Sequence, residues 1–532
     1  MRVQTADPFG TVMTKHNSAK VLYKELRGLP WWQLWSQEAA RFDAATPEER
    51  NKRVAVIRAV GVVFAESGPV EEKEKVRDWL LGLLQDPDEK IRRYAIVAMP
   101  KIGAGAKEEG ELLSALRATT GEREKKFLAQ TLGKIGGPAA LEQSFLGNAE
   151  QKIKASIARR ESPSVVRFHG VLAHFQELRI HLRGRRGLER IVSDEVEQFQ
   201  RKHGKFRVTE VHSGNVAIVP LAPFSLAEIY AMRCFGTAAF VLGNAEGANE
   251  TDSIEALAAV ITSPLSRRLL QTFTEGSIRY RLNFVSKGHQ RAAVGRLASR
   301  VYARCPDILN DGRKVTWTID IYPNGGCHLV ELRPNLTPDP RFLYRQKDVP
   351  AASHPPLAAC LARLAGRIEN EVVWDPFCGS GLELIESAWL GGVRSVYGTD
   401  RSGEAIAIAQ NNFAAAKAKS VPAKFMRGDF RDIASSKLLE AGTVTLIITN
   451  PPMGLRAPVS DLRRLIEDLF RVAATVLKPG GRLVLVNPLA METPHPRLKL
   501  QFQQRVDMGG FACRMEKYVK EEKAGQVRHF SR

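Results

Sequence analysis

The sequence predicts a multidomain protein in which an all-helical repeat region, a mixed α+β region and a doubly wound parallel α/β domain follow one another. Three observations predict this order. An apolar helical pattern returns at intervals of roughly 33–40 residues near the N-terminus. Strand-like and helical patterns then mix. From Glu371 onward, short apolar strands alternate with helices, as in a parallel sheet. We expect an N-terminal segment at 1–40, helical repeats at 41–150, the α+β region at 163–346 and the α/β domain at 347–532.

The composition favours a folded protein that meets a polyanion. The 532 residues carry a formal net charge of +20, and such proteins often bind nucleic acids by displacing counterions from phosphates; the alternative is a solvated basic surface. No run approaches the ~18 apolar residues of a transmembrane helix, and the N-terminus lacks the apolar core of a signal peptide. The six cysteines are scattered without a CxxC pair, so we expect no disulfides, no metal site and a cytoplasmic location.

The repeat region is marked by three similar segments, each with a basic residue, an apolar helix and a closing glycine. They are Arg53–Gly61, Arg93–Gly103 and Lys126–Gly136. The pattern resembles HEAT repeats, for which three copies are about the minimum for a stable stack. The resemblance implies docking of a protein partner or RNA; the alternative is a plain helical bundle. In the preceding segment 1–40, the tryptophan-rich stretch Trp31–Trp35 suggests a packed helix.

The α+β region shows period-2 strands, helical patterns and glycine turns. The strand pairs flank the turns Ser213–Asn215 and Asn324–Gly326. We expect strands at Leu178–Arg183, on both sides of the first turn within 206–219, at Ser277–Val285, Lys314–Ile321 and His328–Arg333, and helices at Gly187–Phe199 and His289–Arg304.

Positive charge concentrates in one part of this region. Between Ser277 and Pro306 there are seven Lys or Arg residues and no acidic residue. Two arginines lie two apart on a predicted strand and three lie four apart on a predicted helix, so each set shares a face. Arginine pairs well with phosphate, and we expect RNA contact here, against the alternative of a solvated face. The residues are Arg279, Arg281, Arg296, Arg300 and Arg304.

The C-terminal part has the regular alternation of a doubly wound sheet, followed by a terminal hairpin. Strands are expected at Glu371–Trp374, Ser395–Thr399, Ala423–Met426, Val444–Thr449 and Arg482–Val486; helices at Glu383–Leu390, Gly403–Ala416 and Ser460–Leu477; and hairpin strands at Leu498–Gln504 and Phe511–Tyr518.

Polar residues follow four consecutive strands at one edge of this sheet. The loop Asp375–Gly381 closes the first strand, and its Gly-x-Gly turn lets a backbone approach a nucleotide-like cofactor. Asp400 follows the second strand, where such folds bind ribose hydroxyls. Asp429 follows the third and Asn450 the fourth. Each aspartate alone is more simply a cap or turn residue, and Cys378 a packing residue, but together these positions predict a ligand site.

The segment Asn450-Pro451-Pro452-Met453 suits chemistry at an amine. An amino group conjugated to a ring is a poor nucleophile. An amide oxygen and a backbone carbonyl can accept hydrogen bonds from its N–H groups and align its lone pair with an electrophilic methyl group. This chemistry relies on positioning and electrostatics and requires no metal.

These two motifs resemble those of Rossmann-like amino-methyltransferases that use S-adenosylmethionine (SAM). The preceding region resembles a ferredoxin-like plus THUMP module, an RNA-binding unit, with Leu343–Arg345 at the junction. THUMP-linked methyltransferases of this type make N2-methylguanosine in the tRNA acceptor stem or in large-subunit ribosomal RNA. The resemblance covers roughly residues 165–520 and implies this activity, with tRNA as the first expected partner and ribosomal RNA as the second.

The resemblance also implies roles for residues. Asp375 and the two glycines would line the methionine end of SAM, Asp400 would hold its ribose, and Asp429 would hold its adenine amino group. Asn450 with Pro451 would hold the target amine. The implied cofactor site is Asp375, Phe377, Gly379, Gly381, Asp400, Asp429 and Asn450, and the implied catalytic set is Asn450, Pro451, Pro452 and Met453.

Two features depart from the family pattern. The family usually has an aromatic residue after Asn-Pro-Pro, which stacks on a flipped-out base, but this chain has Met453. The HEAT-like region is also not part of the usual family plan. The alternatives are therefore an N6-adenine methyltransferase, a protein-glutamine methyltransferase, against which the basic region argues, and an RNA-binding scaffold that has lost catalysis.

Overall fold

The structure is a computed structural model that divides into two compact units. The first contains residues 1–165, 275–282 and 289–315, and the second 166–274, 283–288 and 316–532. The predicted positions His289, Lys314, Gly325, Gly454 and Ser460 lie outside the described residues. Those are 19–42, 49–103, 105–141, 154, 157–159, 162–285, 290–312, 315–324, 326–350, 352–418, 420–433, 439, 442–453, 461–490 and 495–521.

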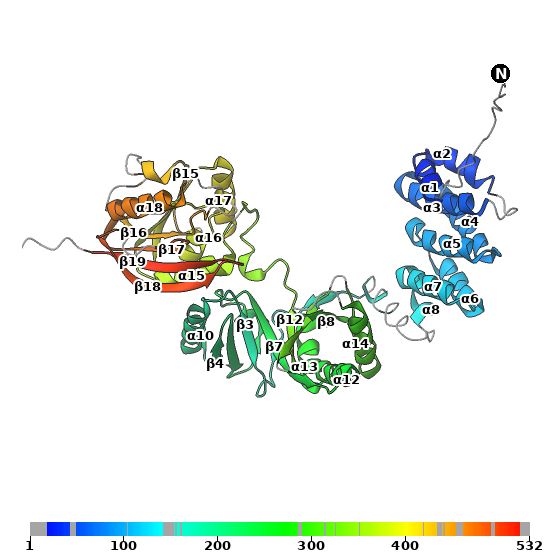
Figure 1. Cartoon of the computed structure of the whole chain (residues 1–532), viewed down its shortest axis with the longest axis horizontal. Helices are drawn as coiled ribbons and strands as arrows, with labels where there is room; N and C mark the ends of the chain where they lie inside the picture. Colours follow the sequence, from blue (N-terminus) through cyan, green and yellow to red (C-terminus); the bar gives the residue numbers. More distant parts are fainter. Residues whose placement is uncertain are drawn as a thin grey trace, which may run out of the picture. The chain divides into compact units, whose positions relative to one another are not determined.

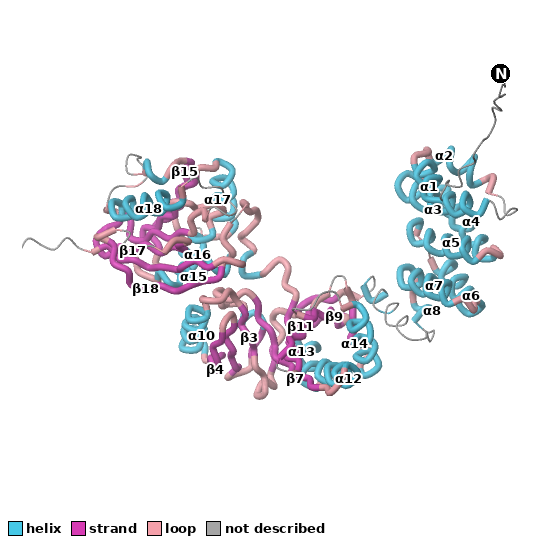
Figure 2. Tube along the Cα trace, viewed as in Figure 1, coloured by secondary structure: helices cyan, strands magenta, loops and turns pink. Residues whose placement is uncertain are grey.

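The described N-terminal residues 19–141 form helices and loops, as the cyan and pink tube in Figure 2 shows. The helical region expected from the sequence is therefore confirmed. Its elements are α1 (Ala19–Arg27), α2 (Trp31–Gln33), η1 (Leu34–Ala39), α3 (Arg50–Ser67), η3 (Val70–Glu72), α4 (Lys73–Gly82), η4 (Leu83–Gln85), α5 (Glu89–Ile102), α6 (Ala106–Ala118), α7 (Glu122–Ile135) and α8 (Pro138–Leu141).

Helices α3, α5 and α7 contain the three repeated segments and pack on one another in that order. A Cβ on Gly61 would lie 2.9 Å from the Ala98 Cβ, so this glycine allows the close approach of α3 and α5. At the N-terminus, the Trp31 ring stacks on Trp35 with centroids 5.2 Å apart. Trp32 is 65% exposed, so the expected packing holds for its neighbours and not for Trp32 itself.

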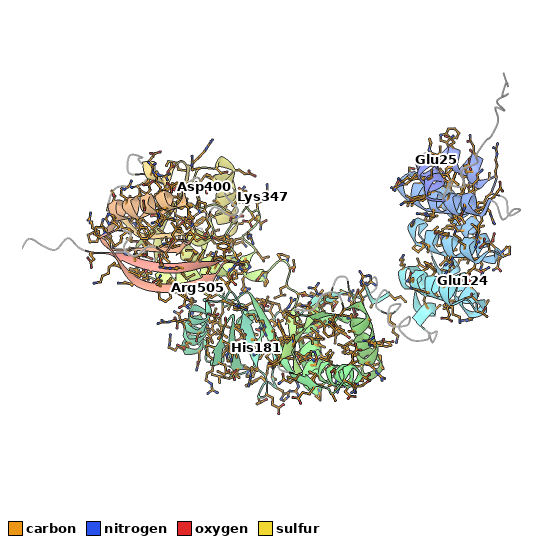
Figure 3. The ribbon with its side chains drawn as sticks, viewed as in Figure 1. Glu25, Glu124, His181, Lys347, Asp400 and Arg505 are labelled. Carbon is orange, nitrogen blue, oxygen red and sulfur yellow. The ribbon has the colours of Figure 1, made fainter. Side chains whose placement is uncertain are left out.

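Ion pairs with a buried acid recur in this region at nearly constant sequence separation. Arg53 Nη2 lies 2.5 Å from Asp86 Oδ2, and Arg92 Nε lies 2.6 Å from Glu124 Oε1, a residue labelled in Figure 3. Arg77 pairs with Glu108 in the same way. The partners are 33, 32 and 31 residues apart, so each pair joins one repeat to the next.

The first unit also contains the basic segment. Strand β9 (Ile278–Phe284) runs parallel to β10 (Ile308–Asn310), which pairs with residues 278–280. Helix α14 (Arg291–Arg304) connects them and buries Leu297 and Val301. Two short strands, β1 (Ser164–Val166) and β8 (Thr274–Gly276), lie at the boundaries of the unit.

The first half of the second unit is an antiparallel sheet with helices, ordered β11-β12-β7-β3-β5-β4. Glu331 on β12 accepts hydrogen bonds from His181 and Arg183 on β3, across the intervening β7; His181 is labelled in Figure 3. The elements are β2 (Val171–Leu172), β3 (Ile180–Arg183), α10 (Glu189–His203), β4 (Phe206–His212), β5 (Asn215–Pro220), β6 (Phe224–Ser225), α11 (Leu226–Ile229), β7 (Thr237–Glu246), α12 (Glu250–Ile261), α13 (Pro264–Phe273), β11 (Trp317–Asn324), β12 (Cys327–Pro334) and η5 (Pro340–Phe342).

The C-terminal half is a Rossmann-like α/β domain, as predicted (Figure 1). Its sheet runs β15-β14-β13-β16-β17-β19-β18, parallel from β15 to β17 and antiparallel at β19 and β18. The inner strands are continuous apolar runs because helices cover both faces. The elements are α15 (Pro355–Ala365), β13 (Glu371–Asp375), α16 (Leu382–Leu390), β14 (Val393–Asp400), α17 (Gly403–Ala415), β15 (Ala423–Arg427), η6 (Phe430–Asp432), β16 (Val444–Thr449), α18 (Leu462–Val476), β17 (Leu477–Asn487), β18 (Leu498–Asp507) and β19 (Ala512–Lys520).

The two halves of the second unit are tied by charged contacts. Arg233 donates from Nε and Nη2 to the two carboxylate oxygens of Glu386, at 2.7 Å each. Arg363 Nη2 donates to Glu195 Oε1 at 3.0 Å. Gly187 has a φ of +93°, and a Cβ there would collide with the Arg505 carbonyl on β18. The close approach at Gly187 places the loop before α10 against the terminal hairpin.

Candidate active site

A cavity of about 800 Å³ opens at the carboxyl ends of the parallel strands. Strand order reverses between β13 and β16, and the crevice at such a switch point is where doubly wound sheets bind ligands. Its volume lies within the ~300–1,000 Å³ range of small-molecule sites. Loops after four strands line it: Pro376–Ser380 after β13, Asp400–Ser402 after β14, Gly428 with Phe430 and Arg431 after β15, and Asn450–Met453 after β16.

The glycine loop after β13 is shaped by the residues around it. Gly379 lines the cavity with a φ of +49°, and its N–H donates to Asp400 Oδ2 at 3.1 Å. Gly381 has a φ of +83° and caps α16, where a Cβ would lie 3.2 Å from the Ala409 Cβ. Gly381 thus allows α16 to approach α17, and the cavity-lining glycine of the pair is Gly379.

Asp375 lies beneath the loop and does not line the cavity. It is fully buried, and its Oδ1 accepts from the Phe377 N–H at 3.0 Å and from Thr449 Oγ1 at 2.7 Å. Burial raises the pKa of this carboxyl well above its ordinary value. Its contacts link the tips of β13 and β16. Asp375 therefore supports the glycine loop from beneath, whereas the resemblance implied that it would line the methionine end of SAM.

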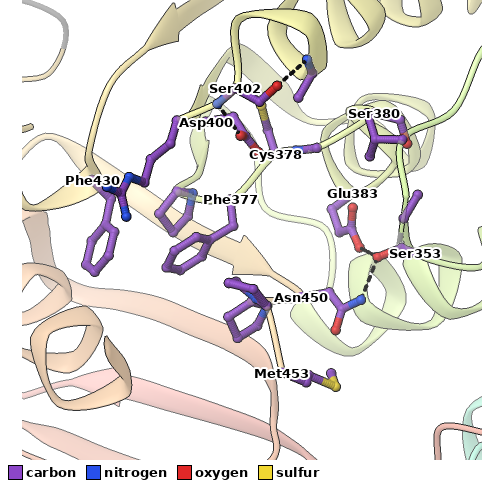
Figure 4. Close-up of a pocket in the computed structure, with 18 of the residues that line it drawn as sticks. Ser353, Phe377, Cys378, Ser380, Glu383, Asp400, Ser402, Phe430, Asn450 and Met453 are labelled. Atoms are coloured by element: carbon purple, nitrogen blue, oxygen red, sulfur yellow. Dashed lines mark hydrogen bonds between the residues drawn. The ribbon is translucent and has the colours of Figure 1, made fainter. Parts of the chain in front are cut away.

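The two later aspartates differ in their surroundings. Asp400 lines the cavity and accepts from the Ser402 N–H at 2.9 Å as well as from Gly379 (Figure 4). Asp429 instead faces Arg431, whose Nη1 lies 3.0 Å from its Oδ2, and its flanking residues line the cavity. The next residue, Phe430, places its ring 4.8 Å from that of Phe377. The sequence motifs pointed to Asp429, and the apolar residue beside it was missed.

Asn450 lies at the tip of β16 in a hydrogen-bond network with two residues that sequence analysis missed. Its Nδ2 donates to Ser353 Oγ at 2.8 Å, and Ser353 Oγ donates to Glu383 Oε1 (Figure 4). Ser353 is 9% exposed and Glu383 3% exposed. The Oδ1 of Asn450 is buried and has no hydrogen-bond partner among the residues that the structure describes.

The network determines which way the amide of Asn450 points. When Glu383 is ionised it only accepts hydrogen bonds, so the Ser353 hydroxyl donates to it and accepts from the Asn450 NH₂ group. With its NH₂ group engaged by Ser353, Asn450 keeps its amide oxygen for another donor. A buried acceptor without a partner costs about 1–3 kcal/mol, so a ligand that donates an N–H here recovers this energy.

Glu383 provides a pH test of this network. Burial raises the pKa of the Glu383 carboxyl. In the folded protein this carboxyl therefore keeps its proton at pH values where the same group in the unfolded chain, with a pKa near 4.3, has lost it. Its contribution to stability is therefore full below about pH 4.3 and is lost as the pH rises through the folded pKa. We expect the thermal midpoint of the parent to fall more steeply with rising pH than that of Glu383→Gln. Parallel curves would contradict this assignment.

Beyond the strand tips, the cavity wall includes Arg185 from the α+β half and Met508 and Phe511 from the terminal hairpin. Met453, the residue after Asn-Pro-Pro, places its Sδ 3.6 Å from Cys513 Sγ on β19. Met453 therefore packs against the hairpin.

The predicted RNA-contacting arginines separate into two groups. Arg281, Arg296, Arg300 and Arg304 are exposed. Arg279 is 4% exposed, and its Nη2 donates to the Ser162 carbonyl at 3.1 Å. Strand β10 pairs with β9 at residues 278–280, a stretch that includes Arg279 and ends before Arg281. Arg279 thus does not belong to the exposed surface that the strand pattern predicted for it.

No group of three or more His, Cys, Asp or Glu side chains among the described residues is arranged to hold a metal ion. No described helix combines the length and the apolar character needed to span a bilayer.

Comparison with known proteins places the C-terminal half. Residues 343–495 match the family model UPF0020, an RMKL-like methyltransferase domain. A tRNA (guanine(10)-N2)-dimethyltransferase of Methanothermobacter thermautotrophicus is 29% identical over 185 residues, 34% of this chain and 49% of that protein. A protein of Methanothermococcus thermolithotrophicus named "Probable tRNA (guanine(10)-N2)-dimethyltransferase" is 30% identical over 132 residues, 25% of this chain and 78% of that protein. This chain belongs to the RMKL-like methyltransferase family.

The RMKL-like domain implies SAM as the cofactor. The crystal structure of TrmN from Thermus thermophilus is 21% identical, covers 65% of this chain and 100% of that chain at a TM-score of 0.50, and shares the fold. The chain spans about half the length, 49%, of the Methanothermobacter relative. The residues around the cavity fit SAM: Gly379 leaves backbone room, Asp400 offers a carboxylate, and the Phe377–Phe430 pair offers aromatic surface for an adenine.

Asp400 gives a direct test of cofactor binding. We expect Asp400→Ala to weaken SAM binding by about 1–3 kcal/mol, because the ribose hydroxyls and the Gly379 N–H lose their acceptor. Calorimetry on the folded variant measures this. Asp429→Ala is the matched control, since its carboxylate pairs with Arg431. Equal losses in the two variants would show that Asp400 has no special role.

Proposed function

We propose that this protein is a SAM-dependent RNA methyltransferase that methylates the exocyclic N2 of a guanosine in tRNA or, second, in large-subunit ribosomal RNA. The observation that carries the proposal is the buried Oδ1 of Asn450, a cavity-lining residue, which has no hydrogen-bond partner among the described residues. An exocyclic amine donates the N–H that this oxygen needs. The names of the curated relatives support guanine N2 as the acceptor.

In the proposed reaction, bound SAM would supply the methyl group: the N–C bond would form as the sulfonium S–C bond breaks, S-adenosylhomocysteine would leave, and the amine would release one N–H proton to solvent. Asn450 Oδ1 accepts one N–H of the target amine and the Pro451 carbonyl the other, so that the nitrogen lone pair faces the methyl donor. The amide dipole also stabilises positive charge as it develops on the nitrogen. Ser353 and Glu383 keep the amide in this orientation and are therefore positioning residues.

We also propose roles for the other regions, with boundaries at 41–150, 163–346 and 347–532. The ion pairs Arg53–Asp86, Arg77–Glu108 and Arg92–Glu124, spaced 33, 31 and 32 residues apart, support HEAT-like repeats at 41–150. Residues 163–346 would form the ferredoxin-like plus THUMP module. The exposed arginines 281, 296, 300 and 304 support RNA binding there. The repeats would dock a protein partner or RNA.

The experiment is a transfer assay with labelled SAM on bulk tRNA and on ribosomal RNA, followed by nucleoside mass spectrometry. N2-methylguanosine is the expected product. N6-methyladenosine would indicate the adenine enzyme, whose target amine suits the same amide. Binding of both SAM and RNA without transfer would indicate a catalytically inactive scaffold, the possibility that Met453 raises.

A further inference from the structure

The tip of the terminal hairpin, residues 507–511, is a rigid part of the cavity wall. Asp507 Oδ1 accepts from the N–H groups of Gly509 at 2.8 Å and Gly510 at 3.0 Å. The Met508 N–H donates to the Phe511 carbonyl at 2.8 Å. Both glycines have positive φ, +96° and +103°, which L side chains rarely adopt. The turn therefore holds Met508 and Phe511 in place as lining residues.

The tip is also fastened on two sides. The Asp507 N–H donates to the Arg186 carbonyl at 2.9 Å, and Arg185 Nη1 donates to the Asp507 carbonyl at 3.2 Å. On the other side, Cys513 Sγ lies 3.6 Å from Met453 Sδ. Met453 and Phe511 both line the cavity.

The aromatic rings around the cavity form two separate surfaces. Phe377 and Phe430, with ring centres 4.8 Å apart, belong to the loops after β13 and β15. Among the described lining residues, Phe511 is the remaining Phe, Tyr or Trp, and it comes from the hairpin. It is partly exposed, so it has ring surface to offer. A methyl transfer from SAM to a nucleobase brings together two flat ring systems, each of which gains from an aromatic partner.

We propose that Phe511 is the surface on which the acceptor base stacks, in place of the residue that follows Asn-Pro-Pro. The proposal rests on the proposed function, because it takes the acceptor to be a nucleobase. Met453 occupies the position after Asn-Pro-Pro where the family usually has a stacking ring, and its side chain packs on Cys513. Arg185, at the same wall, adds a positive charge that suits the phosphate of the same nucleotide.

The kinetic test compares Phe511→Ala and Phe511→Tyr with Phe502→Ala. Phe502 lies on β18 of the same hairpin, outside the cavity lining, and is the matched control. We expect Phe511→Ala to lower kcat/KM for RNA about tenfold to a hundredfold, mainly through KM, with unchanged SAM affinity. Phe511→Tyr should retain most of the activity. A kcat/KM for RNA that is the same in Phe511→Ala as in Phe502→Ala would overturn the proposal.

A second measurement needs no turnover, so it separates this proposal from the proposed function. RNA in which guanosines are replaced by 6-thioguanosine keeps the 2-amino group and crosslinks to adjacent side chains under long-wave light. The full-length protein with bound RNA is irradiated, and the crosslinked peptides are mapped by mass spectrometry. Crosslinks at Phe511 are expected, even if the parent transfers no methyl group. Crosslinks elsewhere, with none at residues 507–513, would overturn the proposal.

Discussion

Replacing Asn450 by alanine is expected to lower the rate of methyl transfer by about 10²–10³-fold, because it removes a preorganised acceptor for the target amine. SAM affinity should remain nearly unchanged, because the proposal assigns the Oδ1 of Asn450, which has no partner among the described residues, to the target amine and not to the cofactor. Single-turnover transfer to RNA measures the first quantity and calorimetry the second.

Ser353→Ala is the informative companion to this variant. It leaves the Asn450 amide in the protein but removes the hydroxyl that orients it, so we expect a smaller loss of rate than for Asn450→Ala. Full activity of Asn450→Ala would place the acceptor site elsewhere. A loss confined to SAM affinity would make Asn450 a cofactor ligand.

Reversing the charge of both Arg296 and Arg300 is the second change with a large expected effect. The two exposed side chains lie one helical turn apart on α14. If each meets a phosphate, Arg296→Glu/Arg300→Glu should weaken RNA binding strongly at low salt. It should also reduce the slope of log affinity against log salt by about 2. Fluorescence anisotropy with tRNA over a salt series measures both.

The control carries the same change in net charge at the opposite edge of the parallel sheet. Arg367 and Arg394 are exposed near the amino ends of β13 and β14, away from the cavity. Arg367→Glu/Arg394→Glu should therefore leave the slope nearly unchanged. Equal slopes for the two double variants would mean that RNA responds to net charge alone and that the α14 arginines form no specific contact.

The parts of the site that could be predicted from sequence are those carried by strand tips. Gly379, Asp400 and Asn450 each follow an apolar strand, and parallel strands end at one edge, so the pattern brings them together. Ser353, Glu383 and Phe511 could not be found in this way. They come from the segment before α15, from the first turn of α16 and from a hairpin turn, and only tertiary packing brings them to the cavity that Asn450 lines.

Two single positions show how local patterns mislead. Arg279 and Arg281 are two apart on one strand, but Arg279 is 4% exposed and bonded to the Ser162 carbonyl, whereas Arg281 is exposed. Asp429 occupies the expected strand end, but its carboxylate pairs with Arg431 and its two neighbours line the cavity in its place. Both outcomes depend on which group lies next in space, and the period of a strand carries no information on that.

The salt link between Arg233 and Glu386 limits how this protein can change over evolutionary time. Glu386 is 3% exposed, and its two oxygens are held by an arginine from the other half of the unit. Removing one partner of such a buried pair costs about 3–5 kcal/mol, a large part of a domain's stability. A catalytic domain acquired from a relative would therefore need an acidic residue that can pair with Arg233. Without one, the contact between the two halves would be lost. We expect the two halves to be inherited together and to diverge by paired substitutions at the contact between them.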